Sequence, residues 1–141
     1  MNNIQIKTDP NMKGLSSVTS VKILEYTLQS EGIEQSDISI IFSSKKLLQE
    51  LKNRFFKIDQ TTDVIAFRLN EYEEKNVEGE IYICLAVARD NAEYYSEPYE
   101  KEIARLIIHG GLHLIGYDDK TKVEERKMQS LENKYLEELK F

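Results

Sequence analysis

The alternation of apolar and polar positions divides the chain into short strands and amphipathic helices. Segments that are short and rich in β-branched or apolar residues are typical of strands. On this basis we predict strands at residues 4–7, 38–42, 63–69 and 80–85. Gly79, directly before the last of them, is expected in a tight turn.

Apolar residues at spacings of three and four predict helices between and after these strands. Ser16 or Ser17 is expected to cap the first helix, and Ser44 the second, because their hydroxyls can accept hydrogen bonds from exposed backbone N–H groups. The apolar stripes of these two helices are Val18, Val21, Leu24 and Leu28, and then Leu47, Leu48, Leu51 and Phe55.

Residues after the last predicted strand form only helices in this interpretation. A short helix runs through Ala92, and Ser96 is expected to cap a longer one that ends at Gly116, where glycine permits a left-handed conformation. Thr121 and Glu124 match a capping box that opens a terminal helix. The stripes of the last two helices are Ile103, Leu106, Ile107, Gly110 and Leu114, and then Met128, Leu131, Tyr135 and Leu139. The element order predicts an α+β fold, and residues 1–141 contain no linker or repeat that would divide a single domain.

The two histidines of the chain, His109 and His113, stand four residues apart in the segment HGGLHLIGYDD. On a helix this spacing places both imidazoles on one face, one turn apart. Asp119 follows Gly116, at which the helix can end and the chain can turn back. Two imidazoles and a carboxylate brought together predict a three-ligand metal site with an open coordination position.

Alternatives to this metal site remain open at the level of sequence. Asp118 or Asp119 can instead cap the helix that follows. The same spacing of histidines and glycine is the frame of the metzincin proteases, in which the residue after the first histidine is a glutamate that acts as general base. Gly110 holds that position here. The motif therefore predicts a metzincin-like metal helix and argues against peptide hydrolysis.

Composition and charge limit the class of function. The chain is 40% hydrophobic and 31% charged, which is typical of a globular protein. A single cysteine, no apolar run of membrane-spanning length and no signal sequence predict a cytoplasmic protein without a membrane partner.

The net charge of -6 argues weakly against a nucleic-acid partner. However, residues 44–57 form a basic strip, whereas residues 71–80 hold five glutamates. The strip can steer a polyanion, or it can be a solvated helix face.

The histidine motif resembles the signature HGxLHLxGYDH of the YbeY family, rRNA maturation factors described as zinc-dependent single-strand endoribonucleases. Residues 62–67 (TDVIAF) resemble the TDVLSF strand of that family, and residues 79–84 (GEIYIC) resemble its GDIxI strand. Further residues that fall where the family pattern has them are Glu102, Met128 and Glu132.

The resemblance implies a mixed four-stranded sheet packed with about five helices. It also implies processing of a 16S rRNA precursor and ribosome quality control, with the small ribosomal subunit or its associated proteins as partners. His109 and His113 would be metal ligands, and Asp119 stands where the family has a third histidine. The resemblance implies Zn²⁺, although two histidines and one carboxylate also suit iron or manganese, and the carboxylate lowers the Lewis acidity of the ion.

A second departure from the family pattern concerns phosphate binding. Where the family has an arginine before the TDV strand, this chain has Phe56, and the nearest basic residues are Arg54 and Lys57. Arg68 stands after Phe67 in place of a family proline. Arg54, Lys57 and Arg68 are thus the candidates for phosphate contact, and no general base stands out. The alternative function is a ribosome-associated assembly or RNA-binding factor whose metal is not catalytic.

Overall fold

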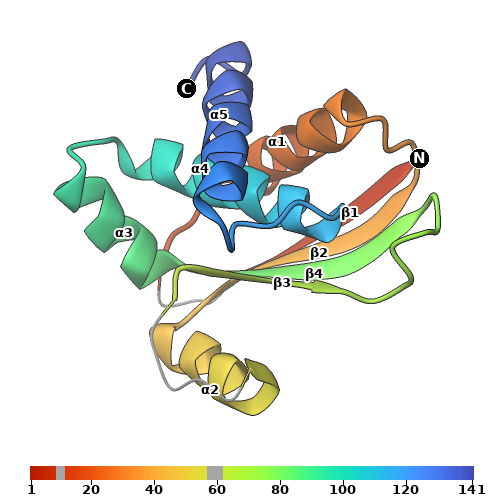
Figure 1. Cartoon of the computed structure of the whole chain (residues 1–141). Coiled ribbons are helices and arrows are strands. Elements are labelled where there is room, and N and C mark those ends of the chain that lie inside the picture. The colour runs from red at the N-terminus through yellow and green to blue at the C-terminus, as the bar shows by residue number, and fades with distance from the viewer. Residues whose placement is uncertain (9–11, 57–61) are drawn as a thin grey trace.

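The computed structural model describes residues 1–8, 12–56 and 62–141 (Figure 1). Within these ranges the fold is α+β, with five helices and one four-stranded sheet, as predicted. In chain order the elements are β1 (Asn2–Thr8), α1 (Ser17–Ser30), β2 (Ser36–Ser43), α2 (Lys45–Phe56), β3 (Val64–Arg68), β4 (Val77–Cys84), α3 (Leu85–Tyr94), α4 (Tyr99–Leu114) and α5 (Lys122–Glu138).

The sheet is mixed, with strand order β1-β2-β4-β3. β1 and β2 are parallel, as are β2 and β4, whereas β3 runs antiparallel to β4 at the edge of the sheet. Parallel pairs need a crossover between their strands, and α1 supplies it between β1 and β2. Helices α1, α4 and α5 lie on one side of the sheet, and α2 lies on the other (Figure 1).

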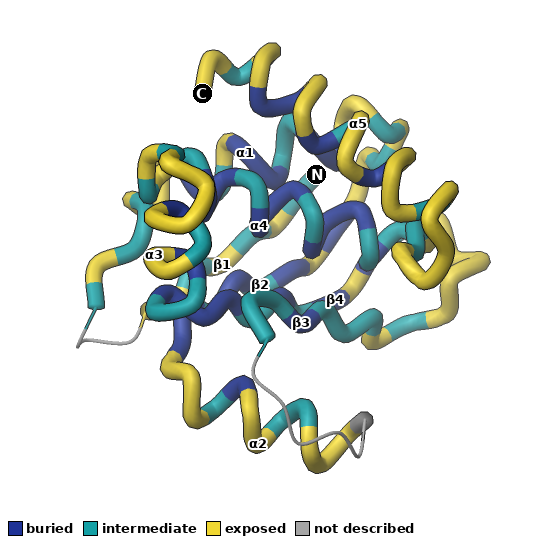
Figure 2. Tube along the Cα trace, turned by 60° about the vertical axis from the view of Figure 1, so that its left-hand side comes forward, coloured by how far each residue is buried: buried dark blue, intermediate teal, exposed yellow. Residues whose placement is uncertain are grey.

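Alternate residues of the strands face two separate hydrophobic cores. The larger core lies on the side of α1, α4 and α5, and Ile40 and Ile81, which are paired in the β2–β4 register, are both fully buried in it. The smaller core lies under α2 and contains Leu48, Ile65 and Cys84. Because α2 contributes only one fully buried side chain, Leu48, among its described residues, much of its surface is exposed (Figure 2).

Glycines set the distance between α4 and the sheet. Gly110 lies on Ile81 of β4 so closely that a Cβ atom there would be 2.6 Å from Ile81 Cγ2. Conversely, the Leu114 side chain occupies the space above Gly79, where an added Cβ would lie 2.8 Å from Leu114 Cδ2. Helix and strand therefore approach through one glycine on each element. This close packing buries one face of α4 and directs the neighbouring face, which carries the histidines, toward the loop before α5.

The helix caps agree in part with the sequence predictions. Ser16 caps α1, and Thr121 and Glu124 form the predicted capping box, each side chain accepting from the other residue's backbone N–H at 3.1 Å. Gly116 follows the end of α4 with φ of 109°. The predicted core stripe of α4 is buried along its length, as are Met128 and Tyr135 of α5.

Several local predictions are wrong because tertiary packing decides them. Gly79 lies inside β4, paired with Ile38 and Arg68, and not in a turn before it. Ser96 has φ of 54° and lies in the turn before α4, whose N-cap is Pro98. Val18 is 80% exposed and Phe55 59% exposed, because α1 and α2 bury narrower faces than their apolar stripes indicate. In the described ranges, the helices are too short or too polar to cross a membrane.

We expect Gly110→Ala to destabilise the protein by about 1–3 kcal/mol, the usual cost of forcing an extra methyl into a packed core. The matched control is Gly111→Ala in the same helix, where the new Cβ would lie 2.8 Å from the flexible end of Leu24, at Cδ1, and at an ordinary contact distance of 3.8 Å from Thr27 Cγ2. Alanine is favoured over glycine in a helix by about 1 kcal/mol, so propensity alone predicts a gain at both positions. Urea unfolding of both variants is the measurement, and equal stability of the two would contradict the packing argument.

Candidate metal centre

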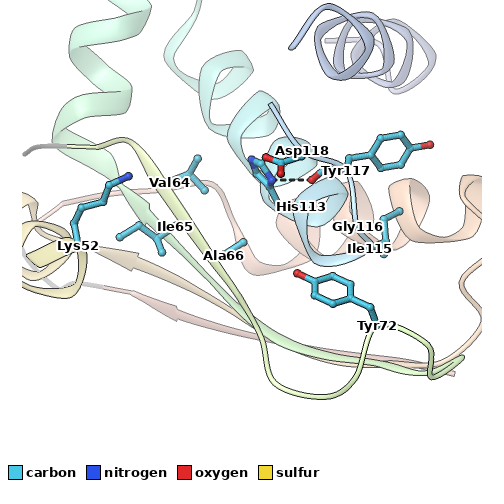
Figure 3. Close-up of a pocket in the computed structure, with 10 residues that line it drawn as sticks. All are labelled: Lys52, Val64, Ile65, Ala66, Tyr72, His113, Ile115, Gly116, Tyr117 and Asp118. Atoms are coloured by element: carbon cyan, nitrogen blue, oxygen red, sulfur yellow. Dashed lines mark hydrogen bonds between the residues drawn. The ribbon is translucent and has the colours of Figure 1, made fainter. Parts of the chain in front are cut away.

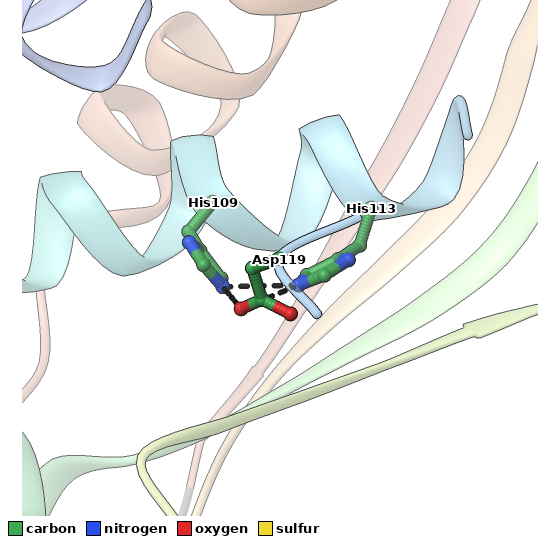
Figure 4. A group of neighbouring side chains, drawn as sticks. All are labelled: His109, His113 and Asp119. Atoms are coloured by element: carbon green, nitrogen blue, oxygen red, sulfur yellow. Dashed lines mark hydrogen bonds and ion pairs between the residues drawn. The ribbon is translucent and has the colours of Figure 1, made fainter. Parts of the chain in front are cut away.

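Three side-chain donor atoms converge at the C-terminal end of α4 (Figure 4). His109 Nε2 and His113 Nε2 are 3.0 Å apart, and Asp119 Oδ2 lies 3.4 Å from the first and 3.5 Å from the second. Donor atoms about 2.0–2.1 Å from a tetrahedral ion are separated by about 3.3 Å. The triangle of donors therefore has the size of three vertices of a tetrahedral metal site, and the donor set suits a divalent ion.

The other ring nitrogen of each histidine is engaged by the protein. His109 Nδ1 lies 2.6 Å from Glu132 Oε2 of α5, and His113 Nδ1 lies 2.9 Å from the Tyr117 carbonyl oxygen. Since a carboxylate and a carbonyl can only accept, both Nδ1 atoms carry the proton and donate it. Each Nε2 then presents its lone pair to the centre of the triangle. Such contacts are typical of metal-ligating histidines, whose ring orientation they fix.

Electrostatics at this centre favours a cation. Two lone pairs and a carboxylate oxygen face one another at 3.0–3.5 Å, an arrangement that is repulsive unless a positive charge lies among them. Burial by itself lowers the pKa of His109, but the hydrogen bond with Glu132 and the negative charges of Glu132, Asp119 and Asp63 outweigh it and raise the pKa above its ordinary value. The surroundings of this ring thus stabilise positive charge, whether carried by a proton or by a metal ion.

Glu132 is held by more than His109. It is 4% exposed, and its second oxygen, Oε1, lies 3.6 Å from Arg105 Nη1. Arg105 Nε lies 3.9 Å from Glu102 Oε1, so this arginine stands between two acidic side chains. Burial raises the pKa of Glu102, against the opposing effect of a hydrogen bond from Asn91. The acidic residues matched to the family pattern thus form a hydrogen-bonded and ion-paired support behind the first histidine.

The loop that carries Asp119 is fixed at both ends. The Tyr117 N–H donates to the Leu112 carbonyl at 3.0 Å, which closes α4 around Gly116. The Tyr117 hydroxyl donates to Oε1 of Glu31, the residue that follows α1, at 2.7 Å, and this bond raises the Tyr117 pKa to about 12. Thr121 caps α5, so neither Asp118 nor Asp119 has the capping role that the sequence left open. The Asp119 carboxylate instead faces the histidines (Figure 4).

A cleft of about 650 Å³ adjoins the donor triangle (Figure 3). Its lining includes residues 64–66 of the edge strand β3, His113, and residues 115–118 of the loop after α4. Lys52 of α2 and Tyr72 of the β3–β4 connection also line it. A ligand lying along β3 would therefore pass beside one of the donor residues.

The predicted phosphate contacts lie in different surroundings. Arg54 is exposed on the last turn of α2, and Lys57 lies outside the described residues. Arg68 donates to Asn70 Oδ1 and to the carbonyl oxygens of Leu114, Glu71, Glu74 and Asn76, at 2.6–3.4 Å. Lys52 lines the cleft but was not singled out by sequence, because only the fold shows which lysine of the basic strip faces β3.

We expect Asp119→Ala to weaken zinc binding by more than the ~10–100-fold that loss of a supporting group costs, because a direct donor is removed. Asp118→Asn is the matched control, since it removes the same charge from the adjacent residue, leaves the donor triangle intact, and keeps a side-chain oxygen that can accept from the Asp119 N–H. Competition with a chromophoric chelator measures both affinities. An equal loss of zinc affinity in the two variants would show that the negative charge near the histidines matters, and that Asp119 is not a direct ligand.

Glu132→Gln should lower zinc affinity about 10–100-fold while all three donors stay in place, because the ring of His109 loses a charged acceptor that orients it and raises its basicity. Glu137→Gln, at an exposed position on the same helix, is expected to leave the affinity unchanged. The same chelator competition applies, with circular dichroism to show that both variants are folded. Unchanged affinity in Glu132→Gln would refute the supporting role.

Comparison with known proteins gives concordant matches. A family model described as "Endoribonuclease YbeY" matches residues 2–140. The protein of that name from Chloroherpeton thalassium is 36% identical over 115 residues, which are 82% of this chain and 80% of the relative. The one from Thermotoga petrophila is 35% identical over 130 residues, 90% of this chain and 83% of the relative.

The fold has a solved counterpart as well. The solution structure of TM1509 from Thermotoga maritima superposes with a TM-score of 0.62 at 27% sequence identity, covering 97% of this chain and 91% of that protein. The mixed four-stranded sheet and its helices, expected from the family resemblance, are thus confirmed by the structure and by this neighbour. Because a family model matches nearly the whole sequence, the chain belongs to the endoribonuclease YbeY family.

Proposed function

We propose that the protein is a metal-dependent single-strand endoribonuclease that matures the 16S rRNA precursor and takes part in ribosome quality control. It would act in the cytoplasm on the small ribosomal subunit or with associated proteins. The observation that carries the proposal is the donor triangle of His109, His113 and Asp119, open on one side and adjoining a cleft. Curated relatives over most of the chain bear the name of an endoribonuclease, which supports the reaction class.

His109, His113 and Asp119 would hold one divalent ion, for which we propose Zn²⁺. When bound, such an ion acts as a Lewis acid that polarises a phosphoryl oxygen and eases the loss of a proton from water. The protein contributes the fixed geometry: Glu132 and the Tyr117 carbonyl orient the two rings, and the closed turn after Gly116 presents the carboxylate. A site whose donors need no rearrangement loses little entropy on binding its ion.

The surroundings of the cleft are suited to one RNA strand. Lys52 extends toward it from α2 (Figure 3), and we propose Arg54 and Lys57, near the end of the same helix, as further phosphate contacts. Arg68 has most of its N–H groups bonded within the protein, so any phosphate contact by it would use the remaining one. Sequence-specific RNA recognition generally targets single strands with splayed bases, and a cleft of about 650 Å³ accommodates only a few nucleotides.

The protein lacks the glutamate general base that metzincin proteases use for peptide hydrolysis. The residue after the first histidine is Gly110, and its Cα faces Ile81 in the core. A glutamate at this position would clash with β4, so the same packing that positions α4 prevents a general base from standing there. The metal helix is thus retained without the protease chemistry.

The alternative candidate is a ribosome-associated assembly or RNA-binding factor with a non-catalytic ion. The net charge of -6 and Phe56 at the position of the family arginine favour it. The two candidates differ in one measurable property, which is cleavage of RNA by the purified protein.

The purified protein with one equivalent of Zn²⁺ is expected to cleave a single-stranded fragment of the 16S rRNA precursor. Chelation should abolish cleavage, and added Zn²⁺ should restore it. His109→Ala should lower the rate by at least about 100-fold, since Lewis-acid stabilisation is worth several kcal/mol. Glu137→Gln, at an exposed position on α5 outside the cleft lining, serves as a control that keeps all three donors.

Gel analysis of the products separates the outcomes. Cleavage that persists after chelation and in His109→Ala preparations would come from a contaminating nuclease and leave the binding factor as the better proposal. Binding of the RNA fragment without cleavage, by protein that holds its full equivalent of metal, would have the same consequence.

A further inference from the structure

Tyr72 is an exposed aromatic side chain in the lining of the cleft beside the donor triangle. It belongs to the connection between β3 and β4, is 59% exposed, and lines the same cleft as His113 (Figure 3). Other aromatic rings of the chain are also exposed, but Tyr72 is the one of these that lines the cleft beside His113 in the described part of the chain. Its position next to Gly116, whose added Cβ would lie 4.0 Å from Tyr72 Cδ1, brings it to the loop that ends in Asp119.

The ring is held by a rigid support and does not project freely. The Arg68 guanidinium carbon lies 5.0 Å from the centroid of the Tyr72 ring, over one of its faces. Arg68 in turn donates 2.8 Å to the Leu114 carbonyl at the end of α4 and 2.9 Å to the Glu71 carbonyl. One face of the ring is thus covered by a cation tied to the metal helix, which leaves the other face for a flat partner.

Charge differs between the two ends of the cleft. Lys52 lines the cleft from α2, a helix that also carries the exposed Arg54. Around Tyr72 the chain is acidic, with exposed glutamates at 71, 73 and 74. A phosphate is repelled by these carboxylates, whereas an uncharged nucleobase is not. The acidic end therefore suits the base of a nucleotide, and the basic end suits the backbone of the strand.

We propose that Tyr72 is a stacking platform for one unpaired nucleobase of the RNA, whose backbone runs from the Lys52 end of the cleft toward the donor triangle. Stacking on aromatic rings is a general means of holding single strands, since every base has a flat face. The inference rests on the proposed function for the identity of the ligand. It adds a substrate-binding residue that lies outside the segments matched to the family motifs.

The first test uses fluorescence, because the chain contains no tryptophan and Tyr72→Trp introduces a single reporter. Titration with a short 2′-O-methyl oligoadenylate, shown by mass spectrometry to remain intact, should quench the new fluorescence as adenine stacks on the indole. An abasic oligomer with the same backbone should not quench it. No quenching by saturating oligoadenylate, or equal quenching by the abasic oligomer, would overturn the proposal.

The second test measures affinity by anisotropy of the labelled oligoadenylate. Tyr72→Ala should raise Kd between about 5-fold and 150-fold, the range of base–aromatic stacking, whereas Tyr72→Phe should retain most of the affinity because it keeps the ring. Tyr94→Ala, which removes an 80% exposed tyrosine at the end of α3, should bind as the unaltered protein does. Equal Kd values for Tyr72→Ala and Tyr94→Ala would overturn the proposal.

Failure of the proposed function can be told apart from failure of this inference. Quenching and loss of affinity in Tyr72→Ala without any RNA cleavage would remove the nuclease and keep the stacking site. Zinc-dependent cleavage with an unchanged KM in Tyr72→Ala would keep the nuclease and remove the stacking site. Zinc content and thermal stability should be the same in all Tyr72 variants, since the side chain lies outside the donor triangle and the cores.

Discussion

The contact between α4 and β4 through Gly110 and Gly79 is the constraint on which the rest of the structure depends. Without a Cβ on Gly110, the helix approaches Ile81 directly, and without one on Gly79 the side chain of Leu114 enters the space above β4. This approach fixes the height and rotation of α4, and so the direction of both histidines. It also lets Arg68 of β3 reach the Leu114 carbonyl at 2.8 Å, which joins the sheet edge to the end of the metal helix.

The donor triangle has the arrangement expected of a metal site before an ion is bound. Glu132 and the Tyr117 carbonyl each accept a hydrogen bond from the Nδ1–H of a histidine, so in the neutral rings both Nε2 lone pairs and the Asp119 carboxylate face a common centre. A cation bound among these atoms would relieve their mutual repulsion, so the affinity for a metal ion would be coupled to the stability of the fold. Asp119 in place of a neutral imidazole strengthens the attraction for a cation but reduces the positive charge left to act on a phosphate.

Chemical roles along the cleft follow from which element supplies each residue. The cleft receives Lys52 from α2 and Tyr72 from the β3–β4 connection, and the chain next to Tyr72 carries exposed glutamates at 71, 73 and 74. The net charge of -6 does not reveal this separation of basic and acidic segments. For a polymer of alternating phosphates and bases, the separation is a source of orientation as well as of affinity.

The sequence by itself determined those features that depend only on contacts between residues a few positions apart in the chain. The His109–His113 spacing, the Thr121 capping box and the glycine stop at Gly116 need only helix geometry, and the structure has all three. The strands and the α+β class were predicted from the pattern of apolar and polar residues. The number of strands in the sheet was predicted from the resemblance to one family. Tertiary structure alone decided that Gly79 lies under Leu114, that Val18 faces solvent, and that Lys52 and Tyr72 share a cleft with His113. The physical reason is that burial and long-range contact depend on how elements pack, and a sequence pattern specifies which face of an element is apolar but not what covers it.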